Sequence, residues 1–308
     1  MRKFAPVMLF ILVSLTWGTT WMAMSLALKT VPPIFATGLR FLSASPFLLA
    51  IAWARQIPVI FPRGQRRFQV FVSIAYFAIP FTLMIYGEQY VSSGLAALIF
   101  SNMPVAVLAC SVIFLGERIT LTKVAGLFVS LAALAGILMQ ELNWGEHSSY
   151  KGVAALLAAA LTHAFVYTIC KKRCCSVPVI TFNALPCLSA GALLLTVGTL
   201  VERPSLGVVS LTSLGAIAYL GAFAGVCGIL GYFALQQRTS AFRASLVFVV
   251  FPLIAIGLEN LMNGHALSHR SIMLVVPLIA GILLTLAPEQ ARNLLRETVP
   301  LISEKEKN

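Results

Sequence analysis

The stretch that most constrains the fold runs from Val91 to Glu117, VSSGLAALIFSNMPVAVLACSVIFLGE. Between Leu95 and Leu115 its only polar interruptions are Ser101, Asn102 and Ser111, and no residue is charged. Hydrocarbon offers the backbone no hydrogen-bond partner except itself, so an apolar run of this length predicts a helix that crosses a lipid bilayer.

The composition extends this prediction to the whole chain. The sequence is 59% hydrophobic and only 10% charged, with a mean hydropathy of +0.92. A soluble protein carries about 25% charged residues, so a soluble globular fold is excluded. Nine further apolar runs follow the same pattern, each close to the ~20 residues that a bilayer requires. The ten predicted helices are Pro6–Leu28, Pro32–Trp53, Phe68–Tyr86, Ser92–Leu115, Leu121–Met139, Gly152–Cys170, Val179–Val201, Leu211–Phe233, Ala241–Met262 and Ser271–Ala287. The predicted fold class is an all-α polytopic membrane protein.

The positive charges predict the orientation of these helices. The net charge is +12, and Lys and Arg cluster in the short segments between apolar runs. With the N-terminus placed in the cytoplasm, 17 of them lie inside, 4 lie outside, and Arg40 falls within a helix. This bias is typical of topology signals that face the cytoplasm and anionic lipid, and it argues against a nucleic-acid partner. The same count places the C-terminus in the cytoplasm.

The motifs of several enzyme classes are missing. The sequence has no Asp, no P-loop and no HExxH motif. We therefore predict no enzymatic or ATP-driven chemistry, no cofactor and no metal site.

The chain contains an internal repeat. An offset of 148 residues superimposes identical residues of the fourth and ninth runs. These pairs include Ser92 with Ser240, Phe100 with Phe248, Pro104 with Pro252 and Gly116 with Gly264. Each unit holds five helices, an odd number, so the second unit enters the membrane from the opposite side. We predict inverted repeats at residues 1–140 and 141–288 and a cytoplasmic polar tail at 289–308. This plan is typical of secondary transporters.

Several short motifs occur in a characteristic order. They are Trp17-Gly18-Thr19-Thr20-Trp21, Arg40-Phe41, Tyr90 to Ile99 (YVSSGLAALI), Pro104 and Gly116-Glu117. Over residues 5 to 288 this order resembles the EamA-type family of the drug/metabolite transporter superfamily. The resemblance implies a ten-helix carrier of the bacterial inner membrane that exports amino acids or related metabolites. Two positions depart from the family pattern: His265 replaces the usual Glu, and His163 replaces the usual aromatic residue.

Two ionisable residues inside predicted helices are candidate site residues. His163, near the middle of its helix, suits a proton relay or a hydrogen bond to substrate. The alternative is a neutral imidazole bonded to a neighbouring helix, and Tyr167 shares its helix face. Arg40 could bind a substrate carboxylate. We favour a structural role for Arg40, paired with Glu88 or with helix carbonyls.

The first helix carries a second set of candidates, Trp17, Thr20 and Trp21, at i, i+3, i+4 spacing. They form either an aromatic and hydrogen-bonding wall for an organic solute or part of a belt at the lipid interface. The position of Trp17 near the middle of its helix favours the wall, whereas Trp21 fits both interpretations.

Ser101 and Asn102 form a third set, just before Pro104. Proline in a spanning helix frees a backbone carbonyl, so this position is either a gate or binding site or a passive kink. Val249 and Val250 occupy the equivalent positions in the second repeat. This mismatch predicts that the first repeat reads substrate polarity and that the second supplies an apolar wall. The remaining candidates, Tyr86, Tyr219 and Tyr232, fit either a binding site or the membrane interface.

Together these patterns predict a secondary transporter that moves a small organic metabolite by alternating access of its two halves. The alternatives are a multidrug or other solute carrier and a membrane protein that transports nothing. The expected partners are a small-molecule substrate and the lipid bilayer. Proton coupling stays open, as does the choice between monomer and homodimer.

Overall fold

The computed structural model describes residues 5–116, 119–141, 147–173, 177–239, 241–264 and 267–286. The predicted tail and the proposed counterparts Glu117 and His265 lie outside these ranges. Within the described residues, ten helices are long and apolar enough to span a membrane. Their number and order confirm the predicted ten-helix arrangement.

Six spans are single helices. They are α1 (Ala5–Leu28), α2 (Pro33–Ala54), α7 (Leu121–Glu141), α8 (His147–Arg173), α9 (Val179–Val201) and α14 (His269–Leu286). The other four are interrupted. They are α3 (Arg66–Val72) with η1 (Ser73–Ala78) and α4 (Ile79–Gly87), α5 (Ser93–Ser101) with α6 (Met103–Leu115), α10 (Leu211–Ala218) with η3 (Tyr219–Gly228) and α11 (Ile229–Arg238), and α12 (Ala241–Ser245) with α13 (Val247–Asn263). A short 3₁₀ turn, η2 (Leu206–Val208), precedes α10.

The interruptions occur in matching spans of the two repeats. Both η1 and η3 are π-helical, and the 148-residue offset superimposes residues 73–78 on 221–226, inside η3. Such segments are rare and gather at functional sites. The α5/α6 span breaks at Asn102, with Pro104 in the first turn of α6, where its missing N–H has no helical partner to lose. The α12/α13 span breaks earlier, at Leu246, and Pro252 lies inside α13.

The same two spans end alike. α6 is capped by Gly116 with φ of 65°, and α13 is capped by Gly264 with φ of 68°. This left-handed conformation favours glycine, which has no Cβ to clash with the following carbonyl. The glycine match seen in the sequence therefore reflects a shared helix-ending geometry.

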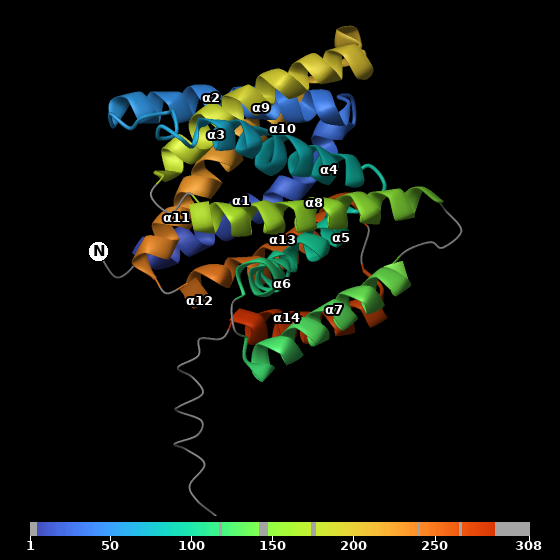
Figure 1. Ribbon diagram of the computed structural model, residues 1–308. Coiled ribbons are helices and arrows are strands. Elements are labelled where there is room, and N and C mark those ends of the chain that lie inside the picture. Colours follow the sequence, from blue (N-terminus) through green and yellow to red (C-terminus); the bar gives the residue numbers. More distant parts are fainter. Residues whose placement is uncertain are drawn as a thin grey trace, which may run out of the picture.

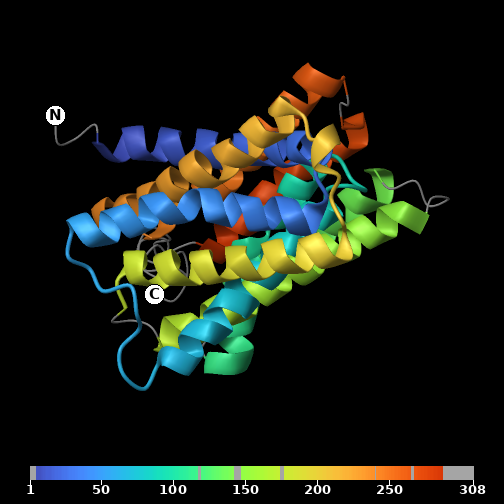
Figure 2. The same ribbon diagram turned by 90° about the horizontal axis from the view of Figure 1, so that it is seen from above.

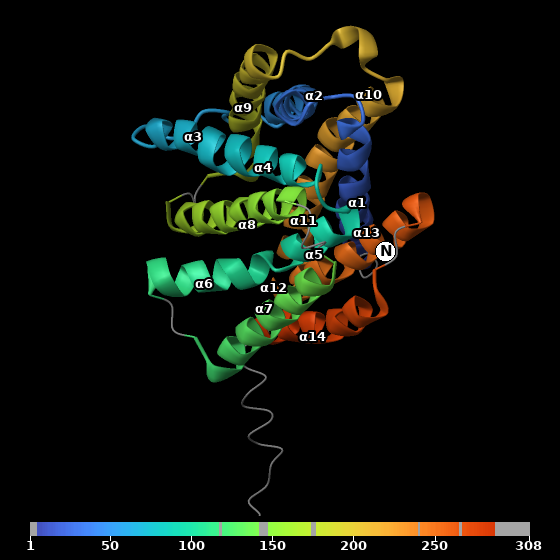
Figure 3. The same cartoon turned by 90° about the vertical axis from the view of Figure 1, so that its right-hand side faces the viewer.

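Two antiparallel helix pairs bound the bundle on opposite sides. Figures 1 and 3 show α2 beside α9 at the top and α7 beside α14 at the bottom, with the other spans between them. Figure 2 shows α2 and α9 running alongside each other from above. Small residues allow these contacts: a Cβ on Gly38 would lie 2.6 Å from the Leu195 nitrogen, and one on Gly126 would lie 2.7 Å from the Gly281 carbonyl oxygen.

The six central spans form two groups, each of which mixes the repeats. α8 packs against η1, α4 and α6, and α1 packs against α10, η3, α11 and α13. Replacing each helix of the first group by its repeat counterpart gives the second group. The pairs α2–α9 and α7–α14 map onto themselves in the same way. This exchange is the pseudo-twofold relation of an inverted-repeat transporter fold.

The two ends of the bundle are marked by different contacts. At one, the Gln89 end, Lys29, Gln89 and Val208 line an open cavity of about 460 Å³. At the other, the Gln65 end, the Gln65 amide donates to the Arg173 carbonyl oxygen at 3.2 Å. α5 begins near the Gln89 end, and α6 continues toward the Gln65 end.

Candidate functional site

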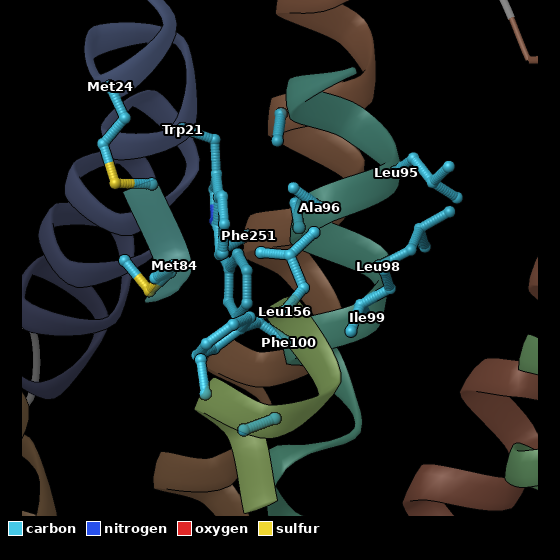
Figure 4. Close-up of a cluster of buried hydrophobic side chains, with 14 of the residues drawn as sticks. Trp21, Met24, Met84, Leu95, Ala96, Leu98, Ile99, Phe100, Leu156 and Phe251 are labelled. Atoms are coloured by element: carbon cyan, nitrogen blue, oxygen red, sulfur yellow. The ribbon is translucent and has the colours of Figure 1, made fainter. Parts of the chain in front are cut away.

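A closed apolar core joins the two central groups. Trp21 of α1, Phe100 of α5, Phe251 of α13 and Leu156 of α8 converge in Figure 4, and all four are buried. The ring centroids of Trp21 and Phe100 lie 5.1 Å apart. Trp21 is therefore a core residue and is not part of an interface belt.

Trp17, one turn from Trp21, lies in a different environment. Its ring contacts Tyr232 at 4.9 Å, Phe248 at 5.5 Å and Phe251 at 6.3 Å between centroids, and its side chain is only half-buried. An aromatic surface of this kind can pack against an organic solute. The hydroxyl of Thr20, in contrast, donates to the Thr16 carbonyl oxygen of its own helix at 2.6 Å.

Tyr219 is tied to the first helix by a residue that sequence reasoning missed. Its hydroxyl lies 2.6 Å from Thr19 Oγ1, across the contact between η3 and α1. The ring of Tyr219 also stacks on Phe223 at 5.5 Å. Thr19 is next to the candidate Thr20, but its partner is 200 positions away, so no local pattern pointed to it.

His163 is buried among aromatic rings from the third span. It packs edge-on against Tyr76 of η1 at 4.6 Å and against Phe81 of α4 at 5.2 Å. Tyr167, one turn further along α8, is 38% exposed and lies near Tyr76 and Tyr232. The predicted pair thus lies beside residues of both repeats.

Arg40 is buried in α2 with only 7% of its side chain exposed. Its Nη1 donates to Met24 Sδ at 3.6 Å, and its guanidinium carbon lies 4.9 Å from the centre of the Phe81 ring. The predicted pairing with Glu88 is wrong as a direct hydrogen bond, because both Glu88 carboxylate oxygens have no hydrogen-bond partner. The two groups still interact electrostatically.

A small cavity borders Arg40. Its volume is about 30 Å³, and its lining includes Arg40, Phe81, Asn183, Cys187 and Gly221. One water molecule needs at least ~10–15 Å³, so a water can occupy this site beside the guanidinium.

Two carboxylates are buried in the described part of the chain, in addition to Arg40. Glu88 follows α4 and is 6% exposed, and Glu259 of α13 is 5% exposed. Asn263 Nδ2 donates to one oxygen of Glu259 at 3.1 Å, and the other oxygen has no partner. Burial raises the pKa of Glu88 well above its ordinary value; the charge of Glu259 adds to this effect, and Ser93 and Arg40 oppose it.

The remaining candidates lie around the break in the fourth span and at the Gln89 end. Ser101 Oγ and Asn102 Nδ2 both donate to the Leu98 carbonyl oxygen, at 2.7 and 3.3 Å, and Asn102 Oδ1 is buried without a partner. Near the Gln89 end the Tyr90 hydroxyl donates to the Tyr86 hydroxyl at 3.2 Å.

The structure thus separates the predicted residues into distinct environments. Trp17 and Tyr219 lie in the wall made by α1 and the eighth and ninth spans, whereas His163, Tyr167 and Arg40 contact or interact with the third span. Sequence reasoning missed three residues of these environments: Thr19, Tyr76 and Glu259. A charge inside an apolar run signals function, and that rule would have identified Glu259. Among the described residues, no three His, Cys, Asp or Glu side chains are grouped to hold a metal ion.

Known proteins are similar to this sequence over nearly its whole length. Residues 5–139 and 150–287 each match the EamA-like transporter family. Protein PagO of Salmonella typhimurium strain LT2 is 58% identical over 294 residues, which cover 96% of each chain. An uncharacterized transporter of Buchnera aphidicola subsp. Schizaphis graminum is 48% identical, over 94% of this chain and 96% of its own. The uncharacterized inner membrane transporter YedA of Escherichia coli K12 is 26% identical, over 88% and 87%.

The fold also has a counterpart among solved structures. One crystal structure superimposes with a TM-score of 0.67 over 96% of this chain and 99% of that chain, at 22% identity. A likeness at this identity concerns the fold alone. Two matched units, ten spanning helices and relatives of similar length lead to one conclusion: this chain is a multi-pass membrane transporter that belongs to the EamA-like transporter family.

Proposed function

We propose that the protein is a secondary transporter that moves a small organic metabolite by alternating access of its two inverted repeats. The observation that carries this proposal is the unequal packing of the two halves of the fourth span. Every residue of α5 is buried, and α5 contacts α1, α8 and α13. In α6 only Val105, Cys110 and Ser111 are buried, and its main partners are α8 and α14.

This difference supports a carrier whose two central groups are held together at one end and packed more loosely at the other. α5 joins the two central groups near the Gln89 end, whereas α6 stays with one group toward the Gln65 end. The break at Asn102 lets the two halves of the span move separately, because it interrupts the backbone hydrogen bonds between them. Exchange of this asymmetry between the repeats would tighten the packing at the Gln65 end and loosen it at the Gln89 end.

Charge supports an orientation for this carrier. Arg63, Arg66, Arg67 and Arg173 lie near the Gln65 end, and positive residues favour the cytoplasmic side. We therefore place the Gln65 end and both termini in the cytoplasm, with the chain in the bacterial inner membrane as in YedA. In this proposal the more loosely packed Gln65 end faces the cytoplasm, which suits loading of a substrate for export.

The chemistry of the substrate is inferred from the side chains that the two central groups carry. Trp17 and Tyr232 supply aromatic surface, and Tyr219, His163 and Tyr167 supply hydrogen-bonding groups. A small amphipathic solute such as an amino acid matches both kinds of surface. In this proposal the first repeat comprises residues 1–140 and the second residues 141–288, followed by a cytoplasmic tail at 289–308.

Flux through purified protein tests this function. Proteoliposomes loaded with the common amino acids and aromatic metabolites would be followed by mass spectrometry of the external medium. We expect the wild type to release at least one solute and Trp17→Ala to reduce its release about tenfold. Trp53→Ala serves as the matched control, because Trp53 is 78% exposed, outside the central groups. Equal flux with protein-free vesicles across the whole mixture would contradict transport and favour a membrane protein with another role.

A further inference from the structure

Three buried carboxylate oxygens meet no hydrogen-bond donor. They are Glu88 Oε1, Glu88 Oε2 and Glu259 Oε2, each fully shielded from solvent. A buried carboxylate that accepts no hydrogen bond is strongly unfavourable, and the usual resolution is neutralisation by a bound proton. These atoms therefore mark a site that is incomplete without a positively charged ligand.

The two carboxylates come from opposite repeats and influence each other. Glu88 interacts electrostatically with Glu259. The helix that begins after Glu88, α5, packs closely on α13, which carries Glu259: a Cβ on Gly94 would lie 3.2 Å from Ile256 Cα. Two like charges held in low dielectric cannot both remain ionised at low cost. One proton shared by the pair removes this repulsion.

The neighbouring groups leave room for that proton in the charge balance. The positive charge of Arg40 favours the ionised form of Glu88. Its guanidinium donates to Met24 Sδ and lies over the Phe81 ring, and it makes no hydrogen bond to a carboxylate oxygen of Glu88. Ser93 also favours the ionised form of Glu88, and its hydroxyl donates to the Trp21 carbonyl oxygen at 3.4 Å. One guanidinium balances one carboxylate, so the second needs a further positive charge. The other ionisable groups that interact with Arg40 are His163 of α8 and Cys187 of α9.

We propose that Glu88 and Glu259 form a proton-binding carboxylate pair across the two repeats, and that this proton couples transport to the pH gradient. Hydronium supplies the proton: one carboxylate oxygen forms an O–H bond, and a water molecule is released. A proton is favoured over a larger cation because it adds no volume. Neither of the two cavities described above is lined by Glu88 or Glu259.

The fold supplies a way to release the proton. Glu88 precedes α5 and Glu259 lies on α13, and these two helices pack together near the Gln89 end. Opening this end would separate them, admit water and stabilise both ionised carboxylates. The coupling rests on the proposed transport function, whereas the proton site itself does not.

Infrared spectroscopy of the purified protein in lipid tests the site without a substrate. At neutral pH we expect the carbonyl stretch of a protonated carboxyl group in the wild type and its loss in Glu88→Gln. Glu259→Gln should shift the titration of this band to lower pH, because the repelling charge is gone. Glu141→Gln is the matched control, since Glu141 accepts from the Ser268 nitrogen at 2.9 Å in an exposed setting. No protonated band in the wild type, or an unchanged titration in Glu259→Gln, would overturn the proposal.

Flux in proteoliposomes tests the coupling separately. With a solute that the wild type transports, an imposed pH gradient should accelerate flux several-fold in the wild type and leave Glu88→Gln unaffected. Wild-type flux that ignores the gradient overturns the coupling while transport stands. A titrating carboxyl band in protein that moves no solute supports the proton site and contradicts the proposed function.

Discussion

The two π-helical segments occupy equivalent positions in the repeats, yet they meet their neighbours differently. Ser73 of η1 and Gly221 of η3 correspond at the 148-residue offset. Ser73 Oγ accepts a hydrogen bond from Ser189 Oγ of α9 at 2.8 Å. A Cβ on Gly221 would overlap the Arg40 carbonyl oxygen and Ser43 Oγ of α2. One crossing is held by a hydrogen bond between side chains, and the other by close backbone contact.

This difference shows where the pseudosymmetry is broken. The closer crossing lies against the turn of α2 that carries Arg40, the buried cation next to His163 and Glu88. Close backbone packing limits movement of that turn, so the guanidinium keeps one position among its partners. The looser crossing involves no charged residue of α9. The repeats therefore share their architecture and differ in how firmly they hold polar groups.

The largest expected effect comes from filling the close crossing. Gly221→Ala places a methyl group on the Arg40 carbonyl, which backbone movement alone can relieve. We expect a loss of about 1–3 kcal/mol in the free energy of unfolding, the cost of overpacking. Thermal melting in detergent measures the change.

Gly215→Ala provides the matched control for this substitution. Gly215 lies in the same span, and a Cβ there would meet nothing within 4 Å. The control should stay within about 0.5 kcal/mol of the wild type. Equal melting of the two variants would show that the two crossings are not distinguished by their packing.

The sequence predicted the spans because hydropathy depends on composition alone. Val179–Val201 matches its predicted bounds, whereas α8 extends past Gly152–Cys170 to His147 and Arg173. Polar residues at the membrane interface continue a helix without any hydropathic signal. The π-helical segments were also missed, since they depend on contacts between distant helices.

The candidate site was predictable only in part. Trp17, Arg40 and His163 stood out because large aromatic or ionisable side chains deep in a spanning helix need a partner. Tyr76 carries no such signal, because tyrosine is common at interfaces. Glu88 was considered only as a partner of Arg40, and its interaction with Glu259 depends on how α5 packs on α13.

The second prediction concerns the charged groups beside the close crossing. Burial holds the pKa of Glu88 well above its ordinary value. Between these two pKa values the unfolded chain is ionised and the folded protein is not, so the free energy of unfolding falls as pH rises. Glu88→Gln removes this penalty. We expect it to melt with the wild type at acidic pH, below the ordinary Glu pKa, and several degrees higher at mildly alkaline pH.

Glu141→Gln again provides the comparison for this melting experiment, because Glu141 is not buried. A Glu88→Gln variant that melts below the wild type at every pH would show that the carboxylate is stabilising when ionised. That outcome would contradict the interpretation that the surroundings of Glu88 favour its neutral form.

The third prediction transfers a residue between the broken spans. Asn102→Val introduces the residue found at the equivalent position, Val250. The substitution removes the buried, unpaired Asn102 Oδ1, and it also removes the long hydrogen bond from Asn102 Nδ2 to the Leu98 carbonyl oxygen. The free energy of unfolding should therefore be unchanged or rise by about 1 kcal/mol. Solute flux should fall several-fold, because a more regular helix moves its halves together. Unchanged flux would show that this break is a passive kink.

The smallest expected effect comes from the looser crossing, where Ser73→Ala removes the hydrogen bond to Ser189. The Leu185 carbonyl oxygen lies 2.9 Å from Ser189 Oγ, so the Ser189 hydroxyl has another acceptor when the Ser73 hydroxyl is lost. The cost should be about 0.5–1.5 kcal/mol, the usual contribution of one hydrogen bond. Ser73→Gly should cost slightly more, because glycine has greater freedom in the unfolded chain. If Ser73→Ala melts as low as Gly221→Ala, the two crossings contribute equally, and the turn of α2 that carries Arg40 is not held more firmly than its counterpart in α9.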